Sequence, residues 1–321
     1  MQYRILGKTK EKVSLLSYGT GGPSQFGQKT GIDDHTRSRL INVAIENGIN
    51  LFDTAPAYGN SEELLGKALK GIDRNSYLIA TKVSTRNEDL SASGDSLVEL
   101  NNPLYPRKSL ERSLIKLNLD YIDIFQFHGL LQKNYDSVME CFLESIIKAR
   151  EEGLIRYIGI TENLVIEPRH DSIVLALQKH PEIWDTIMLK YGIMNQWAAK
   201  NIFQTVKKNN IGILNMAPVR ITLTRNNRLL ERFNEWKINR PDIPGTLEDL
   251  IKLNNGDLIN NKEIISKGYA FAGSHPSVST IITGTSNEKH LIDNIKAANS
   301  KIDSDITKKI IELFGNSDSL D

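Results

Sequence analysis

Short, nearly continuous apolar segments rich in β-branched residues alternate along the chain with segments of helical periodicity. Apolar runs without polar alternation are typical of strands buried on both faces of a parallel sheet. The helical segments repeat apolar residues at i, i+4 and i+7, as in Leu110, Leu114 and Leu117. Eight segments are predicted as strands: Val13–Thr20, Ile49–Ala55, Tyr77–Val83, Ile122–His128, Ile155–Thr161, Thr186–Tyr191, Gly212–Pro218 and Thr280–Thr285.

Strand–helix alternation implies right-handed crossovers and a parallel sheet. Eight such units favour a closed barrel over an open doubly wound sheet, which has about five to seven strands. The glycines of residues 19–22 lack the G-x-G-x-x-G spacing of an open dinucleotide-binding sheet. We therefore predict an α/β fold, a (β/α)8 TIM barrel that comprises residues 1–321 as one domain. The segment Ile5–Val13, which contains Gly7, is predicted to form a hairpin that closes the barrel floor.

Two long polar stretches interrupt the alternation of predicted strands and helices. They are residues 84–106 and residues 219–258. Each follows a predicted strand, so in a barrel both lie at the C-terminal face, where active sites form. Long loops in a compact domain are usually lids or binding loops. We predict that these two loops determine substrate choice. The alternative is that they are insertions without a functional role.

The charge balance excludes several classes of partner. The chain has 40 Lys+Arg and 39 Asp+Glu residues, a net charge of +1. This balance provides no basic surface for nucleic acid or membranes, and no run of about 18 apolar residues is present. The single cysteine, Cys141, forms no intrachain disulfide, and the N-terminus lacks the apolar stretch of a signal peptide. We expect a cytoplasmic protein, with a monomer as the simplest assembly.

Four chemically related residues lie at or just past the ends of three consecutive predicted strands. Asp53 ends the second strand and Tyr58 follows five residues later. Lys82 ends the third strand, and His128 ends the fourth. Because the C-terminal ends of barrel strands meet at one mouth, we expect all four side chains to converge there.

The combination suits proton transfer to a carbonyl oxygen. A tyrosine hydroxyl has an ordinary pKa near 10, and a nearby ammonium lowers that pKa by favouring the phenolate. Lys82 is expected to supply this ammonium, Asp53 to keep it charged, and His128 to donate a hydrogen bond to the substrate. Each residue also has an ordinary structural explanation when it is considered alone. Asp53 could cap a turn and Lys82 could belong to a buried pair. Tyr58 could be a loop aromatic, and His128 could be a core histidine.

Other reaction classes lack their signatures. No Cys/His cluster has metal-ligand spacing, so no metal is expected, and neither a G-x-S-x-G elbow nor a P-loop is present. The eighth strand, in contrast, leads through Gly284 and the hydroxyl residues Thr285 and Ser286 into a helix. A helix N-terminus of this kind binds anions, although an ordinary N-cap has the same pattern.

The chain resembles the aldo-keto reductase family nearly from end to end. Residues 50–62 (NLFDTAPAYGNSE) resemble the family signature around its Asp and Tyr, and Ala80-Thr81-Lys82 resembles its Lys segment. Residues 110–123 resemble the helix that leads to its His, here His128. Residues 158–161 and 274–294 resemble strands and turns that hold its cofactor.

The resemblance implies a catalytic tetrad of Asp53, Tyr58, Lys82 and His128 with a nicotinamide dinucleotide across the barrel mouth. Carried onto this sequence, the cofactor-binding residues would be Thr20, Asp53, Thr161, Asn163, Met216, Ala217, Pro218, Gly284, Thr285, Ser286, His290 and Asn294. It further implies an oxidoreductase that interconverts an aldehyde, ketone or aldose with an alcohol, with a small-molecule carbonyl or sugar as substrate.

The chain departs from the family pattern around the expected cofactor site. Met216 stands where many members have an aromatic residue, and Thr161-Glu162-Asn163 replaces the usual Ser-Asn. Met188 and Leu189 stand where a glutamine is usual. His290 occupies the position where many members have an Arg for the 2′-phosphate, and His binds phosphate weakly near neutrality. NADP(H) and NAD(H) therefore both remain open.

Two alternatives to a reductase or dehydrogenase remain. Some members of this fold serve as cofactor-binding regulatory subunits with little turnover, against which the intact tetrad argues. A non-redox lyase or isomerase on the same barrel is a further alternative. The polar loop residues Arg86, Asn87, Arg220, Arg225 and Trp236 hint at a polar substrate, and Trp197 is expected either to stack on it or to pack.

Overall fold

The computed structural model describes residues 1–85, 101–163, 165–254, 256 and 261–318. The strands in these ranges are β1 (Tyr3–Ile5), β2 (Lys12–Ser14), β3 (Leu16–Gly19), β4 (Leu51–Asp53), β5 (Leu78–Ser84), β6 (Ile122–His128), β7 (Ile155–Thr161), β8 (Thr186–Lys190), β9 (Gly212–Met216) and β10 (Thr280–Thr283). The α-helices are α1 (Asp34–Glu46), α2 (Ser61–Ala68), α3 (Tyr105–Leu117), α4 (Tyr135–Glu151), α5 (Asp171–Lys179), α6 (Trp197–Asn201), α7 (Phe203–Lys208), α8 (Ile221–Thr224), α9 (Asn226–Asn239), α10 (Leu247–Leu253), α11 (Asn261–Ser274), α12 (Glu288–Asn299) and α13 (Ser304–Phe314).

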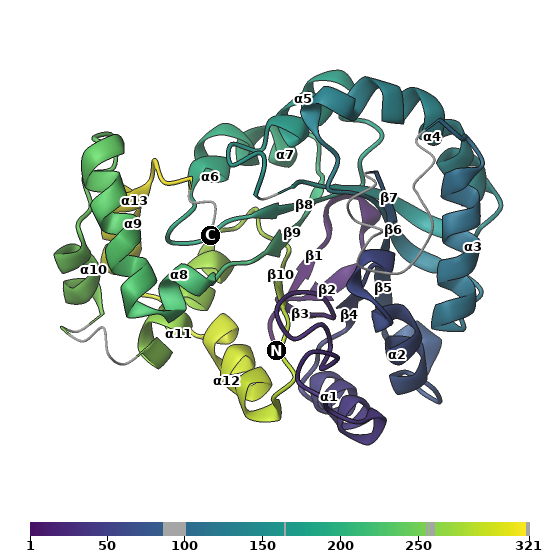
Figure 1. Cartoon of the computed structure of the whole chain (residues 1–321), viewed down its shortest axis with the longest axis horizontal. Helices are drawn as coiled ribbons and strands as arrows, with labels where there is room; N and C mark the ends of the chain where they lie inside the picture. The colour runs from purple at the N-terminus through teal and green to yellow at the C-terminus, as the bar shows by residue number, and fades with distance from the viewer. Residues whose placement is uncertain (86–100, 164, 255, 257–260, 319–321) are drawn as a thin grey trace.

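Strands β3 to β10 close into a barrel in the order β10-β3-β4-β5-β6-β7-β8-β9. Each neighbouring pair is parallel, and the helices lie around the outside of the barrel (Figure 1). The predicted (β/α)8 barrel is confirmed, and each of the eight predicted segments contains a barrel strand. The first segment was predicted too long, because Val13 and Ser14 pair with β1 and only Leu16–Gly19 joins the barrel.

The predicted hairpin at the barrel floor is also confirmed, with wider bounds. Strands β1 and β2 pair antiparallel, with Tyr3 opposite Ser14 and Ile5 opposite Lys12. The turn between them lies beside the start of β9. There the Lys8 amide donates to the carbonyl of Asn210, just before the strand begins. Leu6 and Val13 are fully buried and pack with Leu51 and Leu78 inside the barrel. The hairpin therefore closes the end of the barrel opposite the predicted mouth.

Side chains fill the barrel interior up to the mouth. Ala80, Ile124, Met188 and Leu214 belong to the same interior cluster as the floor residues, and Met216 packs against it from above. The interior is thus a packed core with no continuous channel, as is general for this architecture. A functional cavity consequently has to form above this layer, at the C-terminal ends of the strands.

The stretch 219–258, predicted as a loop, is mostly helical where it is described. It contains α8, α9 and α10, and a turn through Pro241, Pro244 and Gly245 separates the last two helices. These helices lie beside α13 at one side of the molecule (Figure 1). Phe233 packs against Phe314 with ring centroids 5.9 Å apart, and the Gly245 amide donates to the Leu313 carbonyl. The insertion therefore belongs to the main hydrophobic core of the protein. Of the stretch 84–106, residues 86–100 lie outside the described residues.

No helix among the described residues combines the length and apolar character that a membrane span requires.

Candidate active site

The four predicted catalytic residues converge at the mouth of the barrel. Asp53 ends β4, Lys82 lies in β5 and His128 ends β6. The parallel register pairs Asp53 with Ala80 and Ser84 with His128, so the C-terminal ends of the three strands lie side by side. Tyr58 lies in a short 3-10 turn, Pro56–Tyr58, directly after β4.

Lys82 is the centre of this group. Its side chain is fully buried, and its Nζ donates to Asp53 Oδ1 at 2.7 Å and to the Thr54 carbonyl at 2.7 Å. Burial alone would lower the pKa of the Lys82 ammonium, but the charges of Asp53 and Tyr58 outweigh it, so the pKa is raised. Lys82 is therefore held as an ammonium ion in a buried site.

Tyr58 lies between this ammonium and the histidine. The Lys82 Nζ is 4.9 Å from the centroid of the Tyr58 ring. The ring of His128 meets the Tyr58 ring edge-on, with centroids 5.7 Å apart and an interplanar angle of 86°. The Gln28 side chain fixes the turn by donating from Nε2 to the Tyr58 carbonyl at 2.9 Å. The arrangement has a tyrosine hydroxyl with a cation on one side and an imidazole on the other.

Three cavities cover the mouth and extend from it. The tetrad cavity, of about 300 Å³, contains Tyr58, Lys82 and His128 among its lining residues. An adjoining cavity of about 380 Å³ shares Tyr58, Met188, Met216 and Arg220 with it. A third cavity, of about 640 Å³, lies between α11 and α12 and shares Val219, Tyr269 and Gly284 with the second. Shared lining residues make the three cavities one elongated cleft.

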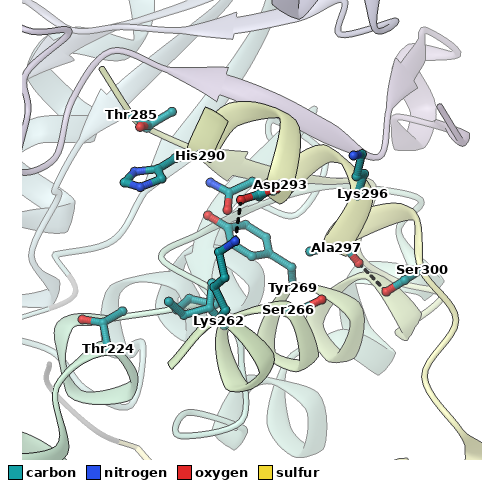
Figure 2. Close-up of a pocket in the computed structure, with 14 residues that line it drawn as sticks. Thr224, Lys262, Ser266, Tyr269, Thr285, His290, Asp293, Lys296, Ala297 and Ser300 are labelled. Atoms are coloured by element: carbon teal, nitrogen blue, oxygen red, sulfur yellow. Dashed lines mark hydrogen bonds and ion pairs between the residues drawn. The ribbon is translucent and has the colours of Figure 1, made fainter. Parts of the chain in front are cut away.

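The outer cavity is polar along one side (Figure 2). Asp293 on α12 forms ion pairs with Lys262 of α11 at 3.4 Å and with Lys289 at 3.1 Å. His290 and Thr285 lie at one end of the cavity, and Lys296 and Ser300 lie at the other (Figure 2). Helix α12 begins here, with Asn287 as its N-cap accepting from the His290 amide at 3.1 Å. The cavity thus combines a helix N-terminus with several cationic side chains, which suits a phosphorylated ligand.

Most of the predicted cofactor-binding residues line this cleft. They are Asp53, Thr161, Asn163, Met216, Ala217, Pro218, Gly284, Thr285, His290 and Asn294. Ala217 has a left-handed backbone (φ +52°), which turns the chain sharply at the end of β9. Gly284 is needed for close packing, because a Cβ there would lie 3.1 Å from the Gly19 carbonyl oxygen.

Two predicted residues lie outside the cleft lining. Thr20 is fully buried, and its hydroxyl donates to Thr54 Oγ1 at 2.8 Å. Its neighbours Gly19 and Gly21 line the second cavity instead. Ser286 accepts a hydrogen bond from Thr30 at 2.9 Å, at the edge of the outer cavity. Both side chains therefore connect neighbouring loops.

Of the polar loop residues named from the sequence, some line the cleft and others do not. Arg220 lines the tetrad cavity and the one adjoining it. Trp236 is buried against Phe233 in the helical insertion, and Trp197 packs against the ring of His170 at 5.8 Å. Arg225 precedes α9 and lines none of the three cavities. Arg86 and Asn87 lie outside the described residues.

Several lining residues were not singled out from the sequence as site residues. Tyr269 and Val219 line both the second and the outer cavity, and Lys262 and Asp293 line the outer one. Glu162 lines the tetrad cavity. Their local patterns resemble ordinary helix faces and turns, so no sequence signal distinguishes the helical ones. Glu162 was noticed only as a departure from the family pattern. Among the described residues, no group of three or more His, Cys, Asp or Glu side chains is arranged to hold a metal ion.

Comparisons with known proteins agree with this geometry. The family model described as "Aldo/keto reductase family" matches residues 16–313. L-galactose dehydrogenase of Arabidopsis thaliana is 26% identical over 305 residues, 92% of this chain and 88% of that protein. An aldo-keto reductase of Bacillus subtilis, YhdN, is 30% identical over 219 residues, 67% of this chain and 61% of that protein. The solved holo form of an aldo-keto reductase from Bacillus halodurans superimposes with a TM-score of 0.72 at 26% identity, covering 98% of this chain and 96% of that one.

Proposed function

The chain belongs to the aldo/keto reductase family, and from this premise we propose that it is an NAD(P)-dependent oxidoreductase that interconverts a carbonyl and an alcohol. The observation that carries the proposal is the convergence of Tyr58, Lys82 and His128 on one cavity at the barrel mouth. A structural role alone gives no reason for a fully buried lysine to lie against a tyrosine ring that faces a cavity.

The proposed chemistry follows from the charges. Lys82, kept as an ammonium by Asp53 at 2.7 Å, favours the phenolate form of Tyr58. Tyr58 then exchanges a proton readily with the oxygen of the substrate, as general acid in reduction and general base in oxidation. His128 donates a hydrogen bond to the same oxygen and orients it. Asp53 acts through Lys82 and has no direct contact with substrate in this scheme.

The cleft fits an extended dinucleotide. Its outer cavity of about 640 Å³ continues through Gly284 and Tyr269 to the tetrad, so one ligand spans both ends. The close packing of Gly284 on Gly19 leaves no room there for a side chain that would divide the cleft. When bound, a nicotinamide dinucleotide supplies or accepts the hydride that the protein itself lacks. We propose that Met216, Ala217 and Pro218 hold its nicotinamide end, and Thr285, His290 and Asn294 its adenosine end.

The proposed substrate is a small aldehyde, ketone or aldose. A relative of this chain is named L-galactose dehydrogenase, which supports testing aldoses early. Arg220 in the tetrad cavity is a polar group suited to sugar hydroxyls. The enzyme is proposed to act as a monomer in the cytoplasm, with NAD(H) and NADP(H) both as candidate cofactors.

Purified protein mixed with para-nitrobenzaldehyde, with NADPH and NADH tested separately, checks the proposal. We expect one of the two cofactors to be consumed, and Tyr58→Phe to reduce the rate at least about a hundredfold because the proton donor is lost. Tyr3→Phe is the matched control, since Tyr3 lies in the floor hairpin, and it should retain the full rate. Aldoses with NAD⁺ or NADP⁺ test the oxidative direction. Cofactor binding without turnover in either direction would favour a regulatory subunit over the proposed enzyme.

A further inference from the structure

Glu162 is a buried carboxylate in the tetrad cavity for which the proposed chemistry has no role. It follows β7 directly, and only 3% of its surface is exposed. It lines the same cavity of about 300 Å³ as Tyr58, Lys82 and His128. Burying a carboxylate costs free energy unless hydrogen bonds and opposite charges compensate. A buried acid beside the reacting groups therefore needs an explanation.

The carboxylate is held in one orientation. Its Oε1 accepts from the Lys190 amide at 2.8 Å, and its Oε2 contacts Nδ1 of His170. His170 is itself fully buried and packs on Trp197. These contacts come from β8 and from the start of α5, so Glu162 is fixed by two separate elements.

His170 contacts Glu162 through one ring nitrogen. Its Nε2 is buried and has no hydrogen-bond partner among the described residues. His170 therefore fixes the orientation of the Glu162 carboxylate through Nδ1 alone. Lys82 and Arg220 line the same cavity as Glu162, and Lys190 lies close enough for its charge to interact with that of Glu162. Asp53 offsets Lys82, whereas Lys190 and Arg220 offset part of the charge of Glu162.

We propose that Glu162 makes this site bind the oxidised nicotinamide cofactor in preference to the reduced one. This inference rests on the proposed function. A nicotinamide ring carries a positive charge only when it is oxidised, and a carboxylate held at the same cavity attracts that charge. Any ring within hydride distance of a substrate at Tyr58 lies in or beside this small cavity.

The preference affects a hydride transfer whose atoms and charges balance. In the oxidative direction the alcohol carbon gives up a hydride to the oxidised cofactor, and the alcohol hydroxyl gives its proton to the Tyr58 phenolate. The positive charge of the ring is lost in this step. Glu162 stabilises the oxidised cofactor before transfer, so it strengthens the binding of NAD⁺ or NADP⁺ relative to the reduced form. Measured dissociation constants report this preference without any turnover.

The test is a set of binding titrations on purified protein with NAD⁺, NADH, NADP⁺ and NADPH. The quantity of interest is the ratio of the oxidised to the reduced dissociation constant. In Glu162→Gln, which keeps the shape and the acceptor for the Lys190 amide, this ratio should rise at least tenfold. A tenfold change equals about 1.4 kcal/mol, or about 30 mV in the potential of the bound two-electron couple.

Two further variants separate charge from shape. Glu162→Asp keeps the charge and should leave the ratio within about threefold of that of the wild type, which is about 0.7 kcal/mol. Glu167→Gln is the matched control, because Glu167 is a buried carboxylate nearby that bonds to the amides of Gln132 and Ser172 and lines none of the three cavities. An equal change in Glu162→Asp and Glu162→Gln would overturn the proposal, as would an unchanged ratio in Glu162→Gln.

The wild-type protein alone provides an independent check if Glu162→Gln does not fold. We expect it to bind the oxidised form at least as tightly as the reduced form. Tenfold tighter binding of the reduced form would overturn the inference and leave the proposed function intact. Failure to bind any of the four cofactors would instead contradict the proposed function.

Discussion

Buried charged residues in this protein are held by oppositely charged partners from other elements of the chain. Lys82 stays charged because Asp53 lies 2.7 Å away, and Asp53 tolerates burial because of Lys82. Asp123, at the start of β6, is similarly enclosed by Arg74 at 2.6 Å and Arg156 at 2.8 Å. Such pairs contribute to stability only while both members are present, because removing one leaves a buried charge unpaired.

Lys82→Met should remove activity and also destabilise the protein. The unpaired Asp53 would cost about 3 kcal/mol of unfolding free energy, and Tyr58 would lose the ammonium that favours its phenolate. Urea denaturation and steady-state assays measure the two effects. In the double variant Asp53→Asn/Lys82→Met, stability should largely return while turnover does not. Recovery of turnover in the double variant would contradict the role assigned to Lys82.

Asp123→Ala tests a buried pair far from the cleft. Arg74 and Arg156 would lose their shared partner, and the Ile79 amide would lose its acceptor at 2.8 Å. We expect a loss of about 3 kcal/mol in urea denaturation, with the turnover number of the folded fraction unchanged at low temperature. A large fall in that turnover number would mean that the strand pair β5–β6 transmits the change to Lys82.

At the scale of elements, the floor hairpin and the barrel meet through backbone atoms with no room between them. Gly7 has φ +52°, and a Cβ there would lie 2.3 Å from the Gly212 amide nitrogen and 2.5 Å from the Asn210 carbonyl oxygen. The neighbouring side chains Leu6 and Val13 complete the interior core. The hairpin is therefore a structural part of the barrel and not a loose extension.

Gly7→Ala should lower the unfolding free energy by more than about 2 kcal/mol, because backbone strain adds to the collision with β9. Gly31→Ala is the matched control: φ is +73°, but no described atom lies within 4 Å of the added Cβ. Its loss should be about 1 kcal/mol, from backbone strain alone. Equal losses in the two variants, measured by chemical denaturation, would rule out the collision.

At the scale of the whole molecule, segments from opposite ends of the chain share one core. The pKa of one histidine, His275, depends on burial in this core. His275 follows α11 and packs against Phe203 and Tyr191, with ring centroids 4.6 Å and 5.4 Å away. Its Nδ1 accepts from the Ser277 amide, and Arg4 from β1 donates to its carbonyl at 2.8 Å. Burial, aided by the charge of Arg4, lowers the pKa of His275 from 6.5 to about 4.

This lowered pKa predicts acid sensitivity. Below pH 6.5 the unfolded chain takes up a proton at His275 that the folded protein does not, so stability falls as the pH drops toward about 4. His275→Phe should flatten the pH dependence in this window while keeping the ring packing. Urea titrations at several pH values measure the slope. His35→Phe, at an exposed position of α1, is the control and should follow the wild-type slope.

The strands and the positions of the four candidate residues at the barrel mouth were predictable because both depend on local patterns. Continuous apolar runs indicate strands buried on two faces, and eight of them with intervening helices specify a closed barrel. Once the barrel is given, Asp53, Lys82 and His128 meet at the mouth because each lies at or near the C-terminal end of one of three neighbouring parallel strands. The predicted loop at 219–258 was wrong where it is helical, because α9 packs against α13, which lies far along the chain.

The sequence by itself thus determined the barrel, its floor hairpin and the positions of Asp53, Tyr58, Lys82 and His128 at strand ends. Only the tertiary structure decided which other side chains line the cleft. Tyr269 and Lys262 come from a helix whose local pattern is ordinary, and Glu162 becomes a fixed buried carboxylate only through His170 and the β8 backbone. The physical reason is that periodicity encodes which face of an element is buried, whereas cavities and buried charges arise from contacts between elements distant in the chain.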